Sequence, residues 1–229
     1  ADQGLLYPCS CTRGDIRAAL AAPQEGVEHL VYPGTCRGRP MADRRPGDAL
    51  RLDLSRALDR LAGQDLAFTE TGPSHAGRPR VHADEALSTI GDIVLSRKGE
   101  DIVAYFLASA FDDADQGITH VIRGQDHLTN THKQILIYEA LGVTPPVFAH
   151  LPLIMAPNKG KLSKRKHGEV VSMTTYRDAG FVAAAFRNFL ALLGWSGGEE
   201  KEIYSMDELI EKFSLDGIHR SNAVFNFHP

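Results

Sequence analysis

Four cations gather in one short stretch of the chain, between Gly160 and Gly168. In order, they are Lys161, Lys164, Arg165 and Lys166. The stretch is not a P-loop, because Met155 stands where the first glycine would be and Leu162 follows Lys161 in place of Ser or Thr. A lysine on a loop beside a sheet edge can still neutralise charge that develops on phosphates during nucleotidyl transfer. Charge alone leaves a second interpretation open, a solvated basic loop or a general nucleic-acid patch.

The three cysteines are spaced so that their thiolates can share one metal ion. Cys9 and Cys11 are separated by one residue, and Cys36 follows a Pro-Gly turn. Three sulfur ligands suit tetrahedral zinc, and such a zinc would be structural because no general base stands nearby in the sequence. The fourth ligand stays open between His29 and Tyr32, of which Tyr32 would be an unusual, hard ligand. The alternative is three free buried cysteines that behave as small hydrophobic residues.

Tyr105 and Arg123 form the third candidate group. Arg123 ends the strand-like segment Ile118–Arg123, and open parallel sheets bind ligands outside the carboxyl ends of their strands. An arginine there can hold a carboxylate by two parallel hydrogen bonds, and the Tyr105 hydroxyl can serve the same ligand. The alternative is an ion pair of Arg123 with Asp113 or Asp126 that fixes a loop.

The elements that must position these residues alternate between strand and helix from Ile90 onward. We predict a strand over Ile118–Arg123, a helix over Thr131–Leu141 and a strand over Val147–Met155. This order is one βαβ crossover, which implies parallel strands and a right-handed connection. The apolar run Leu151–Met155, directly before the cationic stretch, is typical of a buried strand.

The segments on either side of this crossover are simpler. Before it we predict a helix over Arg13–Ala22, and an exposed loop over residues 70–82 because glycines and prolines interrupt that range. After it we predict an amphipathic helix over Phe181–Leu193. Ser205 begins a capping box, which predicts a last helix over Asp207–Phe213.

Composition excludes several classes of protein. The 229 residues suffice for one large or two small domains, and 43% hydrophobic with 24% charged residues is typical of a globular protein. With a net charge of −4, the chain as a whole is not basic. Any contact with nucleic acid must therefore come from local basic patches, such as the arginines between residues 37 and 51. No apolar run is long enough to span a membrane and no secretory signal is present, which predicts a cytoplasmic protein.

These motifs together resemble the glutamate-specific class I aminoacyl-tRNA synthetases over nearly the whole chain. Lys161–Arg165 resembles the Lys-Met-Ser-Lys-Ser loop of that class in its glutamyl variant. The segment from Phe111 through Leu128 resembles the glutamate- and adenosine-binding segment of the family, and so does Phe148–Ile154. This combination is specific enough to set aside the interpretation as a general basic patch.

The resemblance implies a role for each matching residue. Lys164 would be the principal catalytic contact to the ATP phosphates, and Lys161 would assist it. The positions that resemble the ATP-binding ones are Lys161, Leu162, Ser163, Lys164, Arg165, His127 and Leu151. Tyr105 and Arg123 would hold the substrate glutamate, with Arg123 on its side-chain carboxylate. Ser109 stands where the family often has asparagine, which puts that substrate contact in doubt.

Two subfamilies compete for the assignment. The front of the chain resembles the glutamyl-queuosine tRNA(Asp) synthetases, whose zinc site uses a tyrosine in a Tyr-x-x-x-Cys arrangement. That resemblance implies Cys9, Cys11, Tyr32 and Cys36 as zinc ligands. The back, from Gly117 onward, is more similar to full glutamyl-tRNA synthetases, including their stem-contact helices. One departure is clear: the His-Ile-Gly-His element has no counterpart, and we expect it upstream of Ala1.

The resemblance implies an α/β fold, the second half of a class I synthetase Rossmann-type parallel sheet with a small zinc-bearing module and a helical stem-contact region. We place the zinc-bearing acceptor-binding module at residues 1–88, the half-sheet with the cationic loop at 89–168 and the helical region at 169–229. The implied function is ATP-dependent activation of glutamate and its transfer to tRNA, with magnesium ATP, L-glutamate, tRNA and a structural zinc, by a monomer without membrane contact. The alternatives are a glutamyl-queuosine tRNA(Asp) synthetase and a non-catalytic tRNA-binding fragment.

Overall fold

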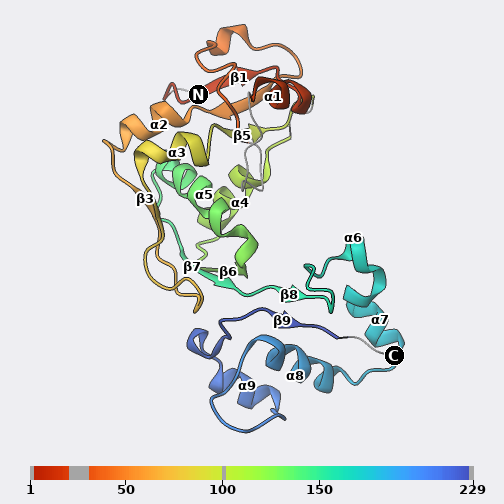
Figure 1. Cartoon of the computed structure of the whole chain (residues 1–229). Helices are drawn as coiled ribbons and strands as arrows, with labels where there is room; N and C mark the ends of the chain where they lie inside the picture. The colour runs from red at the N-terminus through yellow and green to blue at the C-terminus, as the bar shows by residue number, and fades with distance from the viewer. Residues whose placement is uncertain (1–2, 21–30, 100–101, 227–229) are drawn as a thin grey trace. The chain divides into compact units, whose positions relative to one another are not determined.

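The computed structural model describes residues 3–20, 31–99 and 102–226. It divides into two compact units, each built from several stretches of the chain (Figure 1). The first unit comprises Ala1–Phe68, Pro79–Thr119 and Thr129–Pro146. The second unit comprises Thr69–Arg78, His120–Leu128 and Val147–Pro229. The division into modules at residues 1–88, 89–168 and 169–229 stays a prediction.

The first unit is organised around an antiparallel sheet of order β1-β2-β5. In chain order, its elements are β1 (Leu6–Cys9), α1 (Arg13–Ala19), η1 (Met41–Asp43), β2 (Ala49–Leu52), α2 (Leu54–Arg60), β3 (Leu66–Ala67), β4 (Arg80–Val81), α3 (Ala83–Thr89), β5 (Ile93–Ser96), α4 (Tyr105–Asp115) and, except for its first residue, α5 (Leu128–Leu141). Leu6 pairs with Leu52, and Cys9 with Ala49, so the carboxyl end of β1 carries the first cysteine. Thr12 and Asp15 form a capping box that begins α1 directly after Cys11. The predicted helix over Arg13–Ala22 therefore starts where expected, and its last two residues lie outside the described ranges.

The second unit holds the predicted parallel strands. β6 (His120–Gly124) and β7 (Val147–Leu151) pair in parallel, with His120 opposite Val147 and Gly124 opposite Leu151. In the sequence, η2 (Gln125–His127) and α5 (Leu128–Leu141) connect them, which confirms the βαβ order.

The prediction of a single strand over Val147–Met155 is wrong. β7 ends at Leu151, and β8 (Ile154–Met155) pairs in parallel with the distant β9 (Ala223–Val224). Pro152 has no N–H to donate, and the Leu153 N–H donates to the Asn222 side chain at 2.8 Å, so the ladder is interrupted between them. The segment is not buried either, because Ile154 is 39% exposed.

Short helices complete the second unit. They are α6 (Lys164–His167), η3 (Gly168–Val171), α7 (Met173–Asp178), α8 (Ala183–Gly194), α9 (Met206–Lys212) and η4 (Leu215–Gly217). The capping box at Ser205 is confirmed, with Glu208 donating its backbone N–H to the serine hydroxyl at 3.2 Å. Trp195, Tyr204 and Ile218 form a buried apolar cluster in this unit. Among the described residues, no helix is long and apolar enough to cross a membrane.

Candidate functional site

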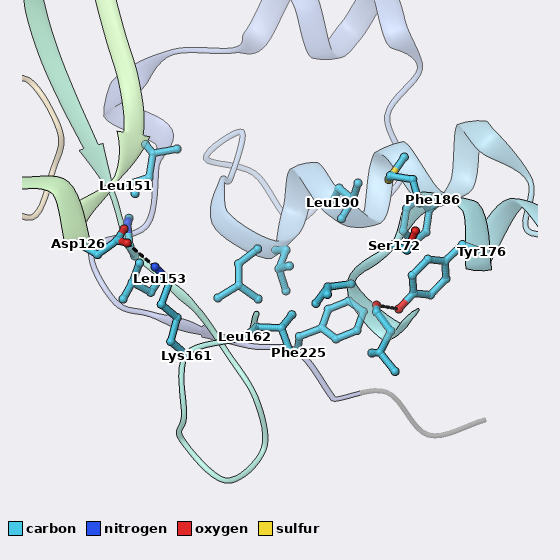
Figure 2. A pocket seen from close by; sticks show the side chains of 17 residues that line it. Asp126, Leu151, Leu153, Lys161, Leu162, Ser172, Tyr176, Phe186, Leu190 and Phe225 are labelled. Atoms are coloured by element: carbon cyan, nitrogen blue, oxygen red, sulfur yellow. Dashed lines mark hydrogen bonds and ion pairs between the residues drawn. The ribbon is translucent and has the colours of Figure 1, made fainter. Parts of the chain in front are cut away.

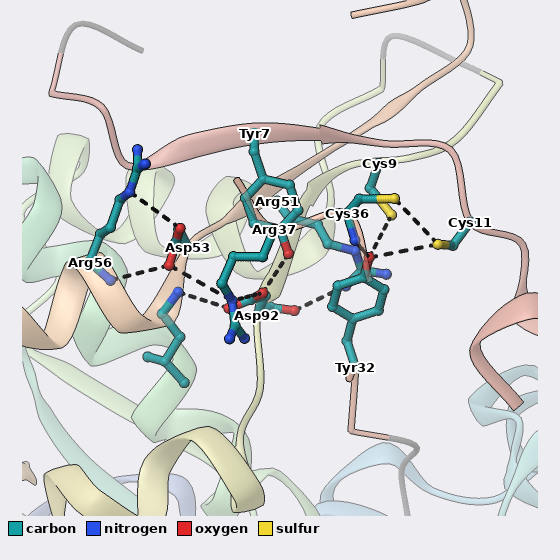
Figure 3. Close-up of polar contacts among 11 residues, drawn as sticks. Tyr7, Cys9, Cys11, Tyr32, Cys36, Arg37, Arg51, Asp53, Arg56 and Asp92 are labelled. Atoms are coloured by element: carbon teal, nitrogen blue, oxygen red, sulfur yellow. Dashed lines mark hydrogen bonds and ion pairs between the residues drawn. The ribbon is translucent and has the colours of Figure 1, made fainter. Parts of the chain in front are cut away.

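The three cysteine side chains of the first unit converge on one point (Figure 3). The sulfur atoms of Cys9, Cys11 and Cys36 all lie within 4.8 Å of one another, and Cys11 Sγ is 3.5 Å from Cys36 Sγ. The Tyr32 hydroxyl joins them, at 3.4 Å from Cys9 Sγ and 3.6 Å from Cys11 Sγ. The end of β1, the segment just before α1, Tyr32 and the turn that follows Tyr32 therefore each contribute one atom to a common centre. The other candidate for a fourth position, His29, lies outside the described residues.

Burial and mutual hydrogen bonding set the acidity of this cysteine cluster. Burial raises the pKa of the Cys11 thiol to about 11. Burial acts in the same direction on Cys36, but hydrogen bonds from the Tyr32 hydroxyl and from the Ser10 backbone outweigh it and lower its pKa to about 7. Burial, with the hydrogen bond to Cys9, raises the pKa of Tyr32. Cys36 therefore supplies a thiolate, the form that binds metal, more readily than Cys11 does.

A buried carboxylate stands behind the cluster. The Asp92 side chain is fully buried, and it accepts hydrogen bonds from the Tyr7 hydroxyl at 2.5 Å, from Arg37 Nε at 2.9 Å and from the Leu54 N–H at 2.9 Å (Figure 3). The guanidinium of Arg51 lies 3.7 Å from the centre of the Tyr32 ring. Such a cation over a ring face fixes the ring plane and therefore the direction of the tyrosine hydroxyl.

The cationic stretch of the second unit folds as a tight turn followed by one helical turn. Met155 and Lys161 form an isolated antiparallel bridge, and the Leu162 N–H donates to the Ile154 carbonyl at 3.0 Å. The helical turn is α6, and it ends at Gly168, whose φ of +59° favours glycine. We call residues 156–168 the cationic turn.

The cations of this turn have different surroundings. Lys161 forms an ion pair with Asp126 of η2 (Figure 2). Lys164, Arg165 and Lys166 are exposed, and within the described ranges none of them forms an ion pair. Three unpaired cations on one helical turn suit a polyanionic ligand that binds from solvent.

Arg123 lies at the carboxyl end of β6, as predicted. Its Nε donates to His150 Nε2 at 3.1 Å, and its Nη2 lies 3.5 Å from the His127 carbonyl oxygen. Its guanidinium also lies 5.5 Å from the centre of the Phe148 ring. The two aspartates that could have paired with it have other partners, since Asp126 binds Lys161 and Asp113 accepts from the Tyr138 hydroxyl.

Sequence reasoning missed two residues beside Arg123. Glu70 is buried and contacts His150 Nδ1 at 2.5 Å, although residues 70–82 are predicted as an exposed loop. His150 is fully buried on β7. Burial, opposed by Glu70, lowers the pKa of His150. The only signal in the sequence is an acidic residue ahead of the Thr-Gly-Pro turn, which is too common to single out Glu70.

The other predicted contacts are divided between the units. In the first unit, Tyr105 begins α4 and is half exposed, and the Ser109 hydroxyl accepts a hydrogen bond from Gln134 at 2.8 Å. In the second unit, Leu151 and Leu162 line a cavity of about 440 Å³ together with Lys161 (Figure 2). Burial, opposed by Asp126, lowers the pKa of the nearby His127. That these residues contact glutamate and ATP stays a prediction.

Comparison with known proteins gives a consistent answer. Residues 78–228 match the family model described as tRNA synthetases class I (E and Q), catalytic domain. The chain is 40% identical over 232 residues to a glutamate–tRNA ligase of Desulfotalea psychrophila and 52% identical over 229 residues to glutamate–tRNA ligase 2 of Koribacter versatilis. These alignments cover 99% and 97% of the chain.

A solved structure agrees with the sequence relatives. The glutamate-tRNA synthetase of Elizabethkingia anophelis is similar with a TM-score of 0.69 and 28% sequence identity, over 98% of this chain and 49% of that one. The sequence alignments cover 44% and 45% of the Desulfotalea and Koribacter proteins. The chain therefore spans somewhat less than half the length of the relatives that it matches.

Proposed function

The chain belongs to the class I tRNA synthetases for glutamate and glutamine, and from this premise we propose that its protein is a glutamate–tRNA ligase. In the proposed reaction, an oxygen of the glutamate α-carboxylate attacks the α-phosphorus of ATP. The bond from that phosphorus to the bridging oxygen breaks, and pyrophosphate leaves. A hydroxyl of the tRNA then attacks the glutamyl carbonyl and releases AMP.

The observation that carries this proposal is the cationic turn beside the parallel strands. Charge accumulates on the pyrophosphate as it leaves, and preorganised cations lower the energy of that transition state. Lys164 is exposed at the start of α6, three positions after Lys161. We assign Lys164 as the main phosphate contact and Lys161 as a second one. Lys161 would give up its ion pair with Asp126 when it binds the ATP phosphates. Magnesium enters with ATP as part of the substrate.

Arg123 is the proposed contact to the glutamate side chain. Its position at the end of β6 is where ligands of parallel sheets bind, and a guanidinium matches a carboxylate in shape and charge. Tyr105 and Ser109 are carried over from the family resemblance as further glutamate contacts. His127 and Leu151 are carried over as adenosine contacts.

We also propose a structural zinc at Cys9, Cys11, Cys36 and Tyr32. Tetrahedral zinc with sulfur ligands at about 2.3 Å separates neighbouring sulfur atoms by roughly 3.8 Å. The 3.5 Å between Cys11 Sγ and Cys36 Sγ is close to that value, and the Tyr32 hydroxyl faces the same centre. Elemental analysis tests the site, and we expect about one zinc per chain. Less than half an equivalent in the wild type would count against it.

The function is tested by glutamate-dependent exchange between ATP and pyrophosphate, followed by charging of tRNA(Glu), in the full-length protein. The Lys164→Ala variant should lose about 100-fold or more in the exchange rate. Lys166→Ala is the matched control, because Lys166 is another exposed cation on α6 to which we assign no role. Equal rates in the wild type and Lys164→Ala would remove the assigned role of Lys164.

A second candidate acceptor is queuosine-containing tRNA(Asp). The Tyr32 hydroxyl lies in the cysteine cluster, and this favours the second candidate. The chain resembles the glutamyl-queuosine enzymes in this Tyr-x-x-x-Cys arrangement. Transfer of glutamate to that tRNA, with none to tRNA(Glu), would select this candidate. Binding of tRNA without any exchange activity would select the third, a non-catalytic RNA-binding protein.

A further inference from the structure

A buried carboxylate and a buried imidazole stand behind Arg123 in the second unit. Glu70 Oε2 is 2.5 Å from His150 Nδ1, and Glu70 Oε1 accepts the His150 N–H at 2.8 Å and the Gly72 N–H at 2.7 Å. The side chains of Glu70 and His150 are both fully buried. The other ring nitrogen of His150, Nε2, receives the hydrogen bond from Arg123 Nε at 3.1 Å.

The donors and acceptors of this chain of contacts fit one arrangement of protons. An ionised carboxylate only accepts, so the hydrogen between Glu70 and His150 belongs to Nδ1. A neutral imidazole protonated at Nδ1 presents Nε2 as an acceptor, which is what the Arg123 N–H requires. With the proton on Nε2 instead, two N–H groups would face each other.

The backbone holds Glu70 against β7. The Phe148 N–H donates to the Thr69 carbonyl at 3.0 Å, and the Thr71 N–H donates to the Phe148 carbonyl at 2.8 Å. Gly72 makes this approach feasible, because a Cβ there would lie 2.5 Å from the His150 carbonyl oxygen. Because the loop packs this closely against β7, the Glu70 carboxylate is held in one position and does not move in solvent.

We propose that Glu70 and His150 are positioning residues, which select the imidazole tautomer and thereby fix the plane of the Arg123 guanidinium. When Nε is held in this way the plane of the guanidinium is fixed, and its terminal nitrogens, of which Nη2 also lies 3.5 Å from the His127 carbonyl oxygen, can bind a carboxylate by parallel hydrogen bonds. The inference rests on the proposed function, in which that carboxylate is the side chain of glutamate. It adds two residues that touch neither the substrate nor the reacting atoms.

The variant Glu70→Gln tests the proposal in the full-length protein. Its amide can donate to Nδ1, so the proton of His150 moves to Nε2. The Nε2–H then faces the Arg123 Nε–H, and the hydrogen bond between them is lost. The KM for glutamate in the exchange assay should rise about tenfold or more, while the KM for ATP stays within about twofold. A purely structural role predicts a smaller active fraction, hence a lower kcat, with both KM values unchanged.

The matched control is Asp65→Asn. Asp65 and His82 form a second carboxylate–histidine contact, at 3.0 Å, but on the exposed surface of the first unit. This variant should leave both KM values unchanged. An unchanged KM for glutamate in Glu70→Gln would overturn the proposal.

Nitrogen chemical shifts of His150 provide a test without substrate. In the wild type we expect a protonated Nδ1 and an unprotonated Nε2, and the opposite tautomer would overturn the proposal even if Glu70→Gln does not fold. If the wild type shows no exchange activity but the expected tautomer, the proposed function fails while the arrangement behind Arg123 stands. If exchange is active and the tautomer is the opposite one, only the positioning role fails.

Discussion

The cysteine cluster and the cationic turn are both dense in reactive side chains, but their partners differ. The cluster makes its contacts within the first unit: its thiols and the Tyr32 hydroxyl contact one another. Arg51 lies over the Tyr32 ring and also donates to the backbone carbonyl of Asp92. In the cationic turn, Lys161 has a protein partner, whereas Lys164, Arg165 and Lys166 extend into solvent without an ion pair among the described residues.

The difference separates two uses of charge. When side chains are paired inside the fold, removal of one leaves its buried partner unpaired, which is strongly destabilising. Side chains that face solvent contribute little to folding, and their charge is available to a ligand. Burial therefore separates the side chains that are paired within the protein from those whose charge is available to a ligand.

The largest effect on stability should come from Asp92→Ala. This change leaves Arg37, the Tyr7 hydroxyl and the Leu54 N–H without their shared acceptor in a buried position. We expect the free energy of unfolding to fall by about 3 to 5 kcal/mol, measured by urea denaturation. Asp59→Ala, an exposed aspartate on α2, is the control and should change it by less than about 0.5 kcal/mol. Similar losses in both variants would contradict the comparison.

The second effect concerns pH and the buried pair of the second unit. Because burial lowers the pKa of His150 in the fold, only the unfolded chain takes up a proton there as the pH falls below about 6.5. The free energy of unfolding should therefore decrease as the pH decreases through that window. This group contributes no more than about 1.4 kcal/mol per pH unit. Glu70, Arg123 and His75 also act on His150 electrostatically, and the pKa of His127 is lowered as well.

The contribution of His150 can be isolated by substitution. The slope of unfolding free energy against pH, measured between pH 7.5 and 5.5, should be smaller in His150→Gln than in the wild type. Equal slopes in the two proteins would show that His150 is not held neutral by its burial in the second unit.

An intermediate effect is expected at an exposed helix cap. Ser205→Ala removes the acceptor for the Glu208 N–H at the start of α9. The free energy of unfolding should fall by about 1 kcal/mol. Ser205→Asp retains a capping oxygen, so it should keep most of that stability, and a loss as large as for alanine would argue against the cap.

The smallest effect should follow from neutralising the cationic turn. The double variant Arg165→Ala with Lys166→Ala removes two exposed charges and leaves no buried group unpaired. Its free energy of unfolding should stay within about 0.5 kcal/mol of the wild type. A loss above about 2 kcal/mol would erase the distinction between the two regions.

Local signals in the sequence predicted much of the fold. The start of the first helix at Arg13, the capping box at Ser205 and the βαβ order around α5 depend on residues close together in the chain, and the structure has all three. The cysteines converge as their spacing predicts. The roles of Lys164, Arg123 and Tyr105 toward ligands stay predictions.

Features set by distant partners could not be predicted. The burial of Glu70 depends on His150, eighty positions further along the chain. The interruption between β7 and β8 depends on Asn222 and β9 in addition to Pro152. Neither partner can be identified from the composition of a loop or from the hydrophobicity of a short run.

The pairing of β8 with β9 has a consequence for the order of events during synthesis. Ile154 lies opposite Ala223, so the strand that precedes the cationic turn cannot find its partner until about seventy further residues have left the ribosome. Pairing between such distant segments is slow, because a long loop must close before any contact rewards it. We therefore expect the cysteine cluster, whose residues all lie between positions 9 and 36, to assemble well before the cationic turn takes its final form.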